Sequence, residues 1–216
     1  FSHGVYIDGH HEIKESDAEK FYREEETVTG LSYSDSPLIT VAEGGTLKLL
    51  QETYLLDNHN KYEEADKVGM VGSVLYNSGT TIVDGALFTN NISKNGADIY
   101  QDGTFTIESA TENLKGHSFY LTTRGDVDHV IQLNAKMRQE PKLVYDIEMD
   151  NPIKGRDVIK FMDPSAYDGN ADAEHDHFKL GDKVPKHLFL VQSPLDAEVL
   201  ELQNWEVLNV EIPSNI

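Results

Sequence analysis

The chain has 216 residues, of which 38% are apolar, and a formal net charge of −20, and this length suits one large domain or two small ones. So strong a negative charge repels nucleic acid and anionic lipid headgroups, so we expect neither as a direct partner. The absence of cysteine excludes disulfides, thiolate catalysis and cysteine-bound zinc, and no apolar run is long enough to predict direct membrane insertion.

Residues 1–37 are predicted to form an N-terminal arm or cap. Within them, residues 8–28 are the only stretch with helical character, and Ile13, Phe21 and Tyr22 are its few apolar anchors. We expect a short helix or a mobile arm here. The N-terminus lacks the basic start and apolar core of a signal peptide, which leaves either a cytosolic protein or a mature chain or fragment. We expect a fragment, with the remainder of a larger polypeptide beside it.

Two stretches, residues 72–91 and 96–115, align without a gap at a period of 24 residues. Periods of about 20 to 50 residues are typical of solenoids and related arrays. Each copy consists of short runs rich in Val, Ile, Thr, Tyr and Phe, separated by Gly, Asn, Ser or Asp, which predicts short strands and tight turns with no room for a helix. The alignment matches several pairs of residues: Leu75 with Ile99, Tyr76 with Tyr100, Gly79 with Gly103, Thr80 with Thr104, Val83 with Ile107 and Ala86 with Ala110.

If each strand stacks on its counterpart one period later, the matched apolar residues form inward ladders. The sequence therefore predicts an all-β fold over residues 38–140, a solenoid of stacked parallel strands. Residues 38–58 repeat the Gly-Thr step one coil earlier, and residues 117–137 are predicted to form the next coil. Gly79 and Gly103 are expected at a corner that requires positive φ, which glycine adopts readily.

Residues 141–216 contain further strand-like runs but lack the 24-residue repeat. We expect irregular coils or a small, β-rich C-terminal cap, because the end of a solenoid otherwise exposes unpaired strand edges. A polar loop over residues 163–185 interrupts these strands.

The repeat resembles that of the pectin-lyase-like right-handed β-helix, in the version found in bacterial surface adhesins and polymorphic outer-membrane proteins. The first copy matches the pattern at Gly79, Thr80, Val83, Ala86, Phe88, Asn90 and Asn91. The second copy matches at Gly96, Ile99, Tyr100, Gly103, Thr104, Ile107 and Ala110. It departs from the pattern at Glu112 and Leu114. Asparagines that stack on one another in successive copies form a ladder in this family, and we expect that ladder to be absent here or one rung long.

This resemblance implies a non-catalytic segment of a bacterial cell-surface or secreted protein, located at the cell surface or outside the cell. Such a segment presents its β-helical surface for adhesion to a carbohydrate or a host or cell-surface protein, or acts as a stalk. The alternative on the same fold is a polysaccharide lyase or glycoside hydrolase. The enzyme requires carboxylates together with a basic residue on one face, and basic residues are sparse around the clear coils.

Four residues of the segment "TTRGDVDH" are the weak catalytic alternative, since lyases and hydrolases combine carboxylates with a basic residue. They are Arg124, Asp126, Asp128 and His129. The competing interpretation is a turn between two strands with Gly125 as its pivot. Four tyrosines, which are Tyr33, Tyr76, Tyr100 and Tyr120, line a sugar-binding face or pack the outside of a ladder.

No cofactor is expected, with calcium as the one exception. Asp168, Asn170, Asp172 and Glu174 alternate along the polar loop, and calcium loops use a similar spacing of oxygen ligands. The alternative is a solvated acidic loop. The sequence offers two further groups of possible metal ligands: His3, Asp8, His10 and His11 near the N-terminus, and Glu174, His175, Asp176 and His177 in the polar loop. His175 and His177 share one face if the segment is a strand, as a two-ligand metal arm requires, but the sequence places no third ligand.

Overall fold

The computed structural model describes residues 5–8, 36–51, 53–56, 58–60, 72–89, 91–93, 98–108, 118–135, 144–163 and 175–204. These residues are nearly all-β, and their one helical element is the 3-10 turn η3 (His175–His177). The N-terminal helix expected within residues 8–28 lies outside the described residues, apart from Asp8. Asp8 ends the strand β1 (Val5–Asp8).

Most strands belong to two sheets. The six-stranded sheet has the order β18 (Phe178–Leu180), β16 (Tyr145–Met149), β12 (Ser118–Leu121), β10 (Ile99–Gln101), β6 (Leu75–Asn77) and β2 (Ile39–Val41). The seven-stranded sheet has the order β19 (Leu188–Gln192), β20 (Val199–Asn204), β17 (Asp157–Phe161), β15 (Ile131–Leu133), β11 (Thr104–Ile107), β7 (Thr80–Val83) and β3 (Thr46–Leu49).

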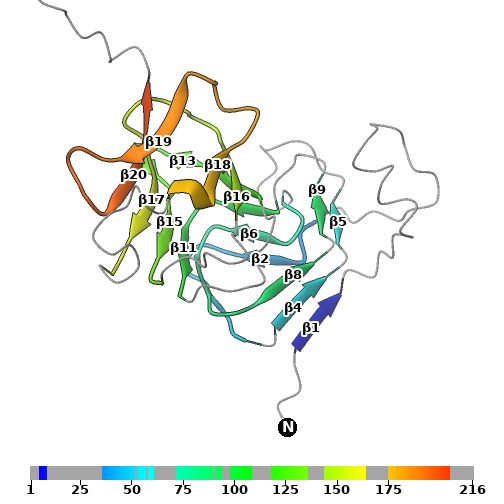
Figure 1. Ribbon diagram of the computed structural model, residues 1–216. Coiled ribbons are helices and arrows are strands. Elements are labelled where there is room, and N and C mark those ends of the chain that lie inside the picture. Colours follow the sequence, from blue (N-terminus) through cyan, green and yellow to red (C-terminus); the bar gives the residue numbers. More distant parts are fainter. Residues whose placement is uncertain are drawn as a thin grey trace, which may run out of the picture.

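The remaining strands form three small sheets. These are β1 with β4 (Thr53–Leu56) and β8 (Leu87–Thr89), β5 (His59–Asn60) with β9 (Ile92–Ser93), and the hairpin of β13 (Thr123–Arg124) and β14 (Val127–Asp128). In Figure 1, β1, β4 and β8 lie together as one group of arrows, separate from the group of β11, β15 and β17.

The chain visits the sheets in a repeating order. From β2 it passes to β3, β4 and β5, and from β6 it passes to β7, β8 and β9 in the same sheets. Pairing between successive visits is parallel, with Leu75 beside Ile99 and Val83 beside Ile107. The two predicted strand partnerships, Leu75 with Ile99 and Val83 with Ile107, are therefore present, whereas the next pairing along the chain, Ile99 with Phe119, has a spacing other than 24 residues. The coil expected at residues 117–137 supplies β12 and β15, and both pair in parallel with the preceding coil.

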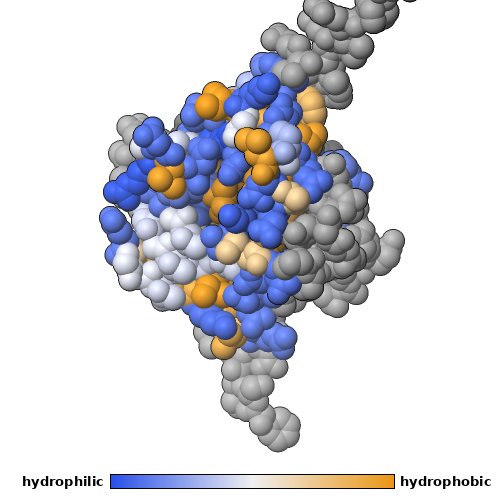
Figure 2. Space-filling model, turned by 90° about the vertical axis from the view of Figure 1, so that its left-hand side faces the viewer, coloured by the Kyte–Doolittle hydropathy of each residue, from blue (hydrophilic) through white to orange (hydrophobic). Residues whose placement is uncertain are grey.

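Exposed apolar residues are scattered over the described surface. The largest exposed fractions belong to Leu195 at 94%, Val127 at 60% and Ile153 at 55%, and these residues come from different loops or strands. The face in Figure 2 likewise shows hydrophobic residues as separate spots within a mostly hydrophilic surface. Isolated apolar residues of this kind are ordinary on a folded protein.

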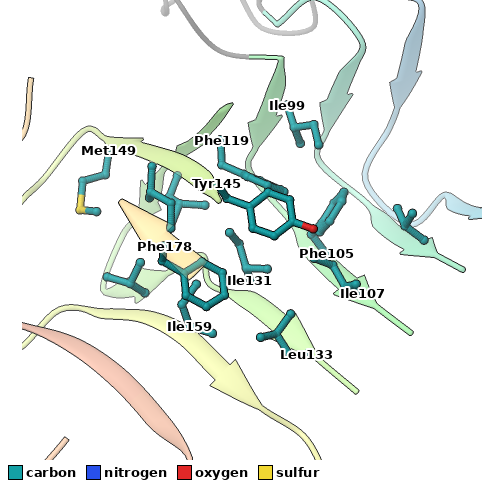
Figure 3. Close-up of a cluster of buried hydrophobic side chains, with 14 of the residues drawn as sticks. Ile99, Phe105, Ile107, Phe119, Ile131, Leu133, Tyr145, Met149, Ile159 and Phe178 are labelled. Carbon is teal, nitrogen blue, oxygen red and sulfur yellow. The ribbon is translucent and has the colours of Figure 1, made fainter. Parts of the chain in front are cut away.

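Alternate residues of the two large sheets point inward and form the core. Ile99, Phe119 and Ile147 follow one another across the six-stranded sheet, while Phe105 and Ile131 do so across the seven-stranded sheet, and all of them are fully buried. Figure 3 shows Phe105, Phe119 and Ile131 among the side chains that meet in this core. An aromatic series runs through the core, with ring centroids 5.2 to 6.0 Å apart from Phe105 through Phe119 and Tyr145 to Phe178.

The prediction that Gly79 and Gly103 adopt positive φ is wrong. The glycines with positive φ are Gly44, Gly72, Gly85, Gly125 and Gly155. Gly79 is needed for a different reason, because a Cβ there would lie 2.5 Å from the carbonyl oxygens of Ala42 and Gly45 in the preceding coil. A Cβ on Gly103 would overlap the carbonyl oxygen of Gly79. Both glycines allow the backbones of stacked corners to approach closely.

Asparagine side chains connect neighbouring coils. Asn91 Oδ1 accepts a hydrogen bond from the backbone N–H of Asn58 at 3.1 Å, and Asn91 Nδ2 donates to the Leu55 carbonyl oxygen at 2.9 Å. The sequence suggested no partner for Asn91 because the following copy lacks an asparagine. Its partners Asn58 and Leu55 instead lie 33 and 36 residues earlier, so a spacing of 24 residues does not find them.

The chain after residue 140 continues the same sheets before it changes direction. β16 pairs in parallel with β12, and β17 pairs in parallel with β15. β20 and β19 then complete the seven-stranded sheet in antiparallel fashion. The boundary between 38–140 and 141–216 stays a prediction. Among the described residues, no helix is long and apolar enough to cross a membrane.

Candidate functional site

The hairpin β13–β14 occupies a corner between the two large sheets. In earlier coils the chain turns this corner within a few residues, as at Ser78 and Gly79 between β6 and β7. After β12 the corner is enlarged into a hairpin, and Gly125 at its tip has a φ of 64°. The prediction of a turn with Gly125 as its pivot is confirmed.

Thr122 fixes the base of this hairpin to the preceding coil. Its Oγ1 lies 2.8 Å from Asp102 Oδ1, 3.0 Å from the Gln101 carbonyl oxygen and 2.8 Å from His129 Nδ1. A hydroxyl carries a single proton, and an ionised carboxylate or a carbonyl can only accept one. If Thr122 donates its proton to Asp102 or Gln101, it bonds to His129 by accepting the Nδ1–H of the ring.

With Nδ1 donating to Thr122, the neutral ring of His129 leaves Nε2 as its acceptor. The part of the chain that the structure describes provides no hydrogen-bond donor to Nε2. Burial is the main influence on His129 and lowers its pKa below the ordinary value of 6.5. The nearby negative charge of Asp102 opposes that shift, and its carboxylate oxygen lies 3.6 Å from Nδ1.

A buried arginine lies behind the hairpin. Arg156 is 1% exposed, and its Nη1 donates to Asp150 Oδ1 at 3.1 Å while its Nη2 donates to the Leu121 carbonyl oxygen at 3.2 Å. Its Nε lies 3.6 Å from Asp128 Oδ1. Asp150 also accepts the backbone N–H of Thr123 at 2.9 Å. Two carboxylates thus share one guanidinium, which compensates for burying its charge.

The structure brings together two of the four residues predicted as a catalytic alternative. Asp128 and His129 both belong to this corner cluster. Asp126 lies exposed at the tip of the hairpin. The Arg124 side chain is 61% exposed and reaches Glu43 of an earlier coil, with its Nη1 3.7 Å from Glu43 Oε2. An ion pair so exposed contributes little stability.

Sequence reasoning missed Asp102, Thr122, Asp150 and Arg156. The first three share one signal, since each directly follows a strand of the six-stranded sheet: β10, β12 and β16. Aligning the coils by these strand ends would have placed the three residues at one corner. Arg156 precedes β17 and carries no such signal, because its partners are Asp150 of the same connection and Asp128 of the hairpin β13–β14.

The predicted tyrosine face is a stack of rings. Tyr76, Tyr100 and Tyr120 lie on successive strands with centroids 5.2 Å apart and ring planes within 9° of parallel. Tyr76 is 2% exposed and Tyr100 is 8% exposed. The rings cover one another's faces, so the middle ring has no face left to stack on a sugar. Burial is the main cause that raises the pKa of Tyr100 and Tyr120. Tyr33 lies outside the described residues.

The predicted calcium ligands Asp168, Asn170, Asp172 and Glu174 lie outside the described residues, as do His3, His10 and His11. His175 and His177 belong to η3 rather than to a strand, so they do not alternate along one. His175 Nε2 contacts Asp176 Oδ1 at 3.0 Å, whereas His177 is buried. Within the described ranges, no group of three or more His, Asp or Glu residues is arranged to hold a metal ion.

The chain was compared with known protein families, curated proteins and solved structures. No family model matches the chain, and neither the curated proteins nor the solved structures contain a match.

Proposed function

We propose that the chain is a right-handed parallel β-helix and a non-catalytic segment of a bacterial cell-surface or secreted protein. The segment presents a surface for adhesion, to a carbohydrate or to a protein of a host or cell surface, or it serves as a stalk. The repeated order of parallel strands, which continues from β2 to β18, supports the β-helix. The resemblance of the repeat to that of surface adhesins supports the location outside the cell.

The observation that carries the non-catalytic proposal is the mutual pairing of charges at the corner. Arg156, the cationic group nearest Asp128 and Asp150, is almost fully buried and bonded to protein oxygens. A group that stabilises a reacting anion must reach the substrate. The exposed Arg124 points to Glu43 instead. The charged groups of the corner therefore stabilise the packing of the hairpin β13–β14 against the neighbouring strands of the two large sheets.

A binding screen tests this proposal. The folded chain is applied to a glycan array and to a panel of extracellular matrix and cell-surface proteins, with a heat-unfolded sample as the control. Saturable binding by the folded sample alone supports adhesion. Binding to nothing on either panel supports the stalk.

The second candidate is the polysaccharide lyase or glycoside hydrolase, and one observation favours it. His129 is held by Thr122 and Asp102 in the tautomer that presents an unprotonated Nε2, as a general base requires. Against it stands the charge of −20, which repels acidic polysaccharides and lowers their encounter rate.

The enzyme is tested by measuring unsaturated products and new reducing ends over a panel of uronates and neutral glycans, with millimolar calcium present. We expect no turnover. His129→Ala removes the candidate base, and Arg124→Ala removes the exposed cation. Turnover that His129→Ala abolishes in a variant with an unchanged melting curve would overturn the non-catalytic proposal.

Calcium remains a proposal for Asp168, Asn170, Asp172 and Glu174. Their oxygen atoms suit a hard cation, and the alternative is a solvated acidic loop. Isothermal titration with calcium tests it, with the double variant Asp168→Asn, Asp172→Asn as the control. Heat that saturates in the parent and disappears in the variant supports the site.

A further inference from the structure

The antiparallel hairpin of β19 and β20 completes one end of the seven-stranded sheet. β20 pairs with β17, where the parallel pairing of the preceding strands gives way to antiparallel pairing (Figure 1). The hairpin contributes Leu190, Leu200 and Leu202 to the buried core. The contact between β17 and β20 therefore decides how firmly the hairpin covers this end of the core.

This contact places two carboxylates opposite each other. Asp157 on β17 is the register partner of Glu201 on β20, and the register shifts between Asp157 and Ile159. Opposite residues of antiparallel strands have Cβ atoms about 4.5 to 5.5 Å apart, so like charges at such positions destabilise the pairing. The strand that closes the sheet is thus paired through a repulsive position.

The side chain of Glu201 has little freedom to move away from Asp157. Glu201 is 6% exposed, and Gln203 Nε2, from the same strand, donates a hydrogen bond to its Oε1. The amide of Gln203 holds the carboxylate but brings no positive charge to it. Among the described residues, neither Asp157 nor Glu201 forms an ion pair.

The charges around Asp157 favour its protonated form. Burial is the largest influence and raises the pKa of Asp157 above its ordinary value of 3.8, and the negative charges of Glu201, Asp128 and Asp196 raise this pKa further. Lys160 on the same strand lowers it. The folded chain therefore binds a proton here more readily than the unfolded chain does. Stability is gained as pH falls through the raised pKa toward 3.8, and this gain is absent at neutral pH.

We propose that Asp157 and Glu201 form a pH-sensitive contact, in which uptake of one proton by the pair tightens the pairing of β20 with β17. The hairpin then covers the end of the core more firmly in acid than at neutral pH, because one proton removes the repulsion between the two carboxylates. The direction is opposite to that of His129, whose lowered pKa weakens the fold as pH falls. The contact requires neither adhesion nor enzymatic activity.

Native-state hydrogen exchange tests the contact at single amides. The Leu202 N–H donates to the Arg156 carbonyl oxygen at 2.9 Å, and the Phe161 N–H donates to the Glu198 carbonyl oxygen at 2.8 Å, so both hydrogen bonds cross the contact. Between about pH 7 and about pH 4.5, we expect the protection factors of these two amides to rise at least about threefold. The protection factor of the Thr104 amide, which lies between β7 and β11, should not rise in this way.

Two variants identify the groups that bind the proton. Asp157→Asn and Glu201→Gln each remove one charge of the pair and keep the shape of the side chain, and glutamine at residue 201 can still accept from Gln203. Either variant should raise the protection of the two amides at neutral pH and remove the rise on acidification. Asp182→Asn is the matched control, because it removes the same charge from an exposed residue between β18 and β19.

Three results would overturn the proposal. One is a rise at Thr104 equal to that at Leu202 and Phe161, because the response would then belong to the whole fold. Another is a pH response in Asp157→Asn or Glu201→Gln as large as in the parent, because other groups would then bind the proton. The third is a loss of the response in Asp182→Asn, because net charge rather than the pair would then set the pH dependence.

Discussion

Tyr145 places a hydroxyl group in the apolar core between the two large sheets. The residue is 1% exposed, its hydroxyl has no hydrogen-bond partner among the described residues, and burial raises its pKa. Its ring packs between Phe119 and Phe178 (Figure 3). The ring therefore stabilises the core while the hydroxyl opposes it, since an unpaired buried polar group costs about 1 to 3 kcal/mol.

The first prediction is that Tyr145→Phe raises the free energy of unfolding by about 1 kcal/mol, because it removes the unpaired hydroxyl and keeps the ring. Tyr145→Ala should instead lower it by about 3 to 5 kcal/mol, because a cavity remains. Urea unfolding followed by circular dichroism measures both changes. A loss of stability in Tyr145→Phe would show that the hydroxyl has a partner in solution.

His129 links the stability of the corner to pH. Burial, the largest influence, lowers its pKa, so the unfolded chain binds a proton more readily than the folded chain does. The resulting loss of stability begins as pH falls below the ordinary histidine value of about 6.5 and is complete below the folded pKa. Asp102 and Asp150 oppose the shift, while Arg124 and Arg156 add to it.

The second prediction is that His129→Asn reduces the loss of stability between about pH 7 and about pH 5. Asparagine keeps an N–H that can donate to Thr122 and does not titrate. Urea midpoints measured across this range give the difference between the parent and the variant. A pH dependence that is steeper in His129→Asn would contradict the sign of the pKa shift.

At the scale of the elements, stacked strands keep corresponding residues in register over several coils. Val83 lies beside Leu49 on one side and Ile107 on the other, and all three are buried. A charged side chain at such a position would be buried without water or an ionic partner, which is costly. Because Val83 contacts residues on both sides, the substitution would disturb both neighbouring strands.

The third prediction is that Val83→Asp lowers the free energy of unfolding by at least about 3 kcal/mol. Thr104→Asp is the matched control, because Thr104 belongs to the next strand of the same sheet and is exposed. The control should change stability by no more than about 0.5 kcal/mol. Melting curves of the two variants, compared with the parent, decide whether Val83 faces the core.

The corners of neighbouring coils approach too closely for a side chain. Gly103→Ala should therefore lower the free energy of unfolding by about 1 to 3 kcal/mol, because its Cβ would overlap the Gly79 carbonyl oxygen. Gly125→Ala provides the comparison, since no atom lies within 4 Å of a Cβ there and only its φ of 64° opposes the substitution. The loss for Gly125→Ala should be about 1 kcal/mol. Urea unfolding of both variants separates close packing from backbone strain.

At the scale of the whole molecule, the charge of −20 opposes the compact state. Added salt screens charges on the surface but screens the buried Arg156 pairs far less. The fifth prediction is that the melting temperature rises as sodium chloride increases from about 0.01 M to about 0.5 M. Sucrose at equal osmolality controls for general solute exclusion. A melting temperature that falls with salt would mean that surface ion pairs such as Arg124 with Glu43 outweigh the net repulsion.

The sequence by itself determined the strands of the clear repeat and their partners. The 24-residue spacing brings Leu75 beside Ile99 and Val83 beside Ile107 whatever the surroundings, because side chains that alternate along a strand must stack in phase. It also indicated the turn at Gly125. It could not find the asparagine partner of Asn91, since an insertion changes the spacing between those coils.

The tertiary structure alone decided the corner cluster and the function of the glycines. Asp102, Thr122 and Asp150 follow three different strands and meet only because the chain passes one corner repeatedly, where Arg156 also lies. Gly79 and Gly103 looked like residues that require positive φ, whereas close approach of stacked backbones excludes their side chains. The local sequence shows which backbone conformations a residue can adopt. Only the packed structure shows which atoms of neighbouring segments lie against that residue.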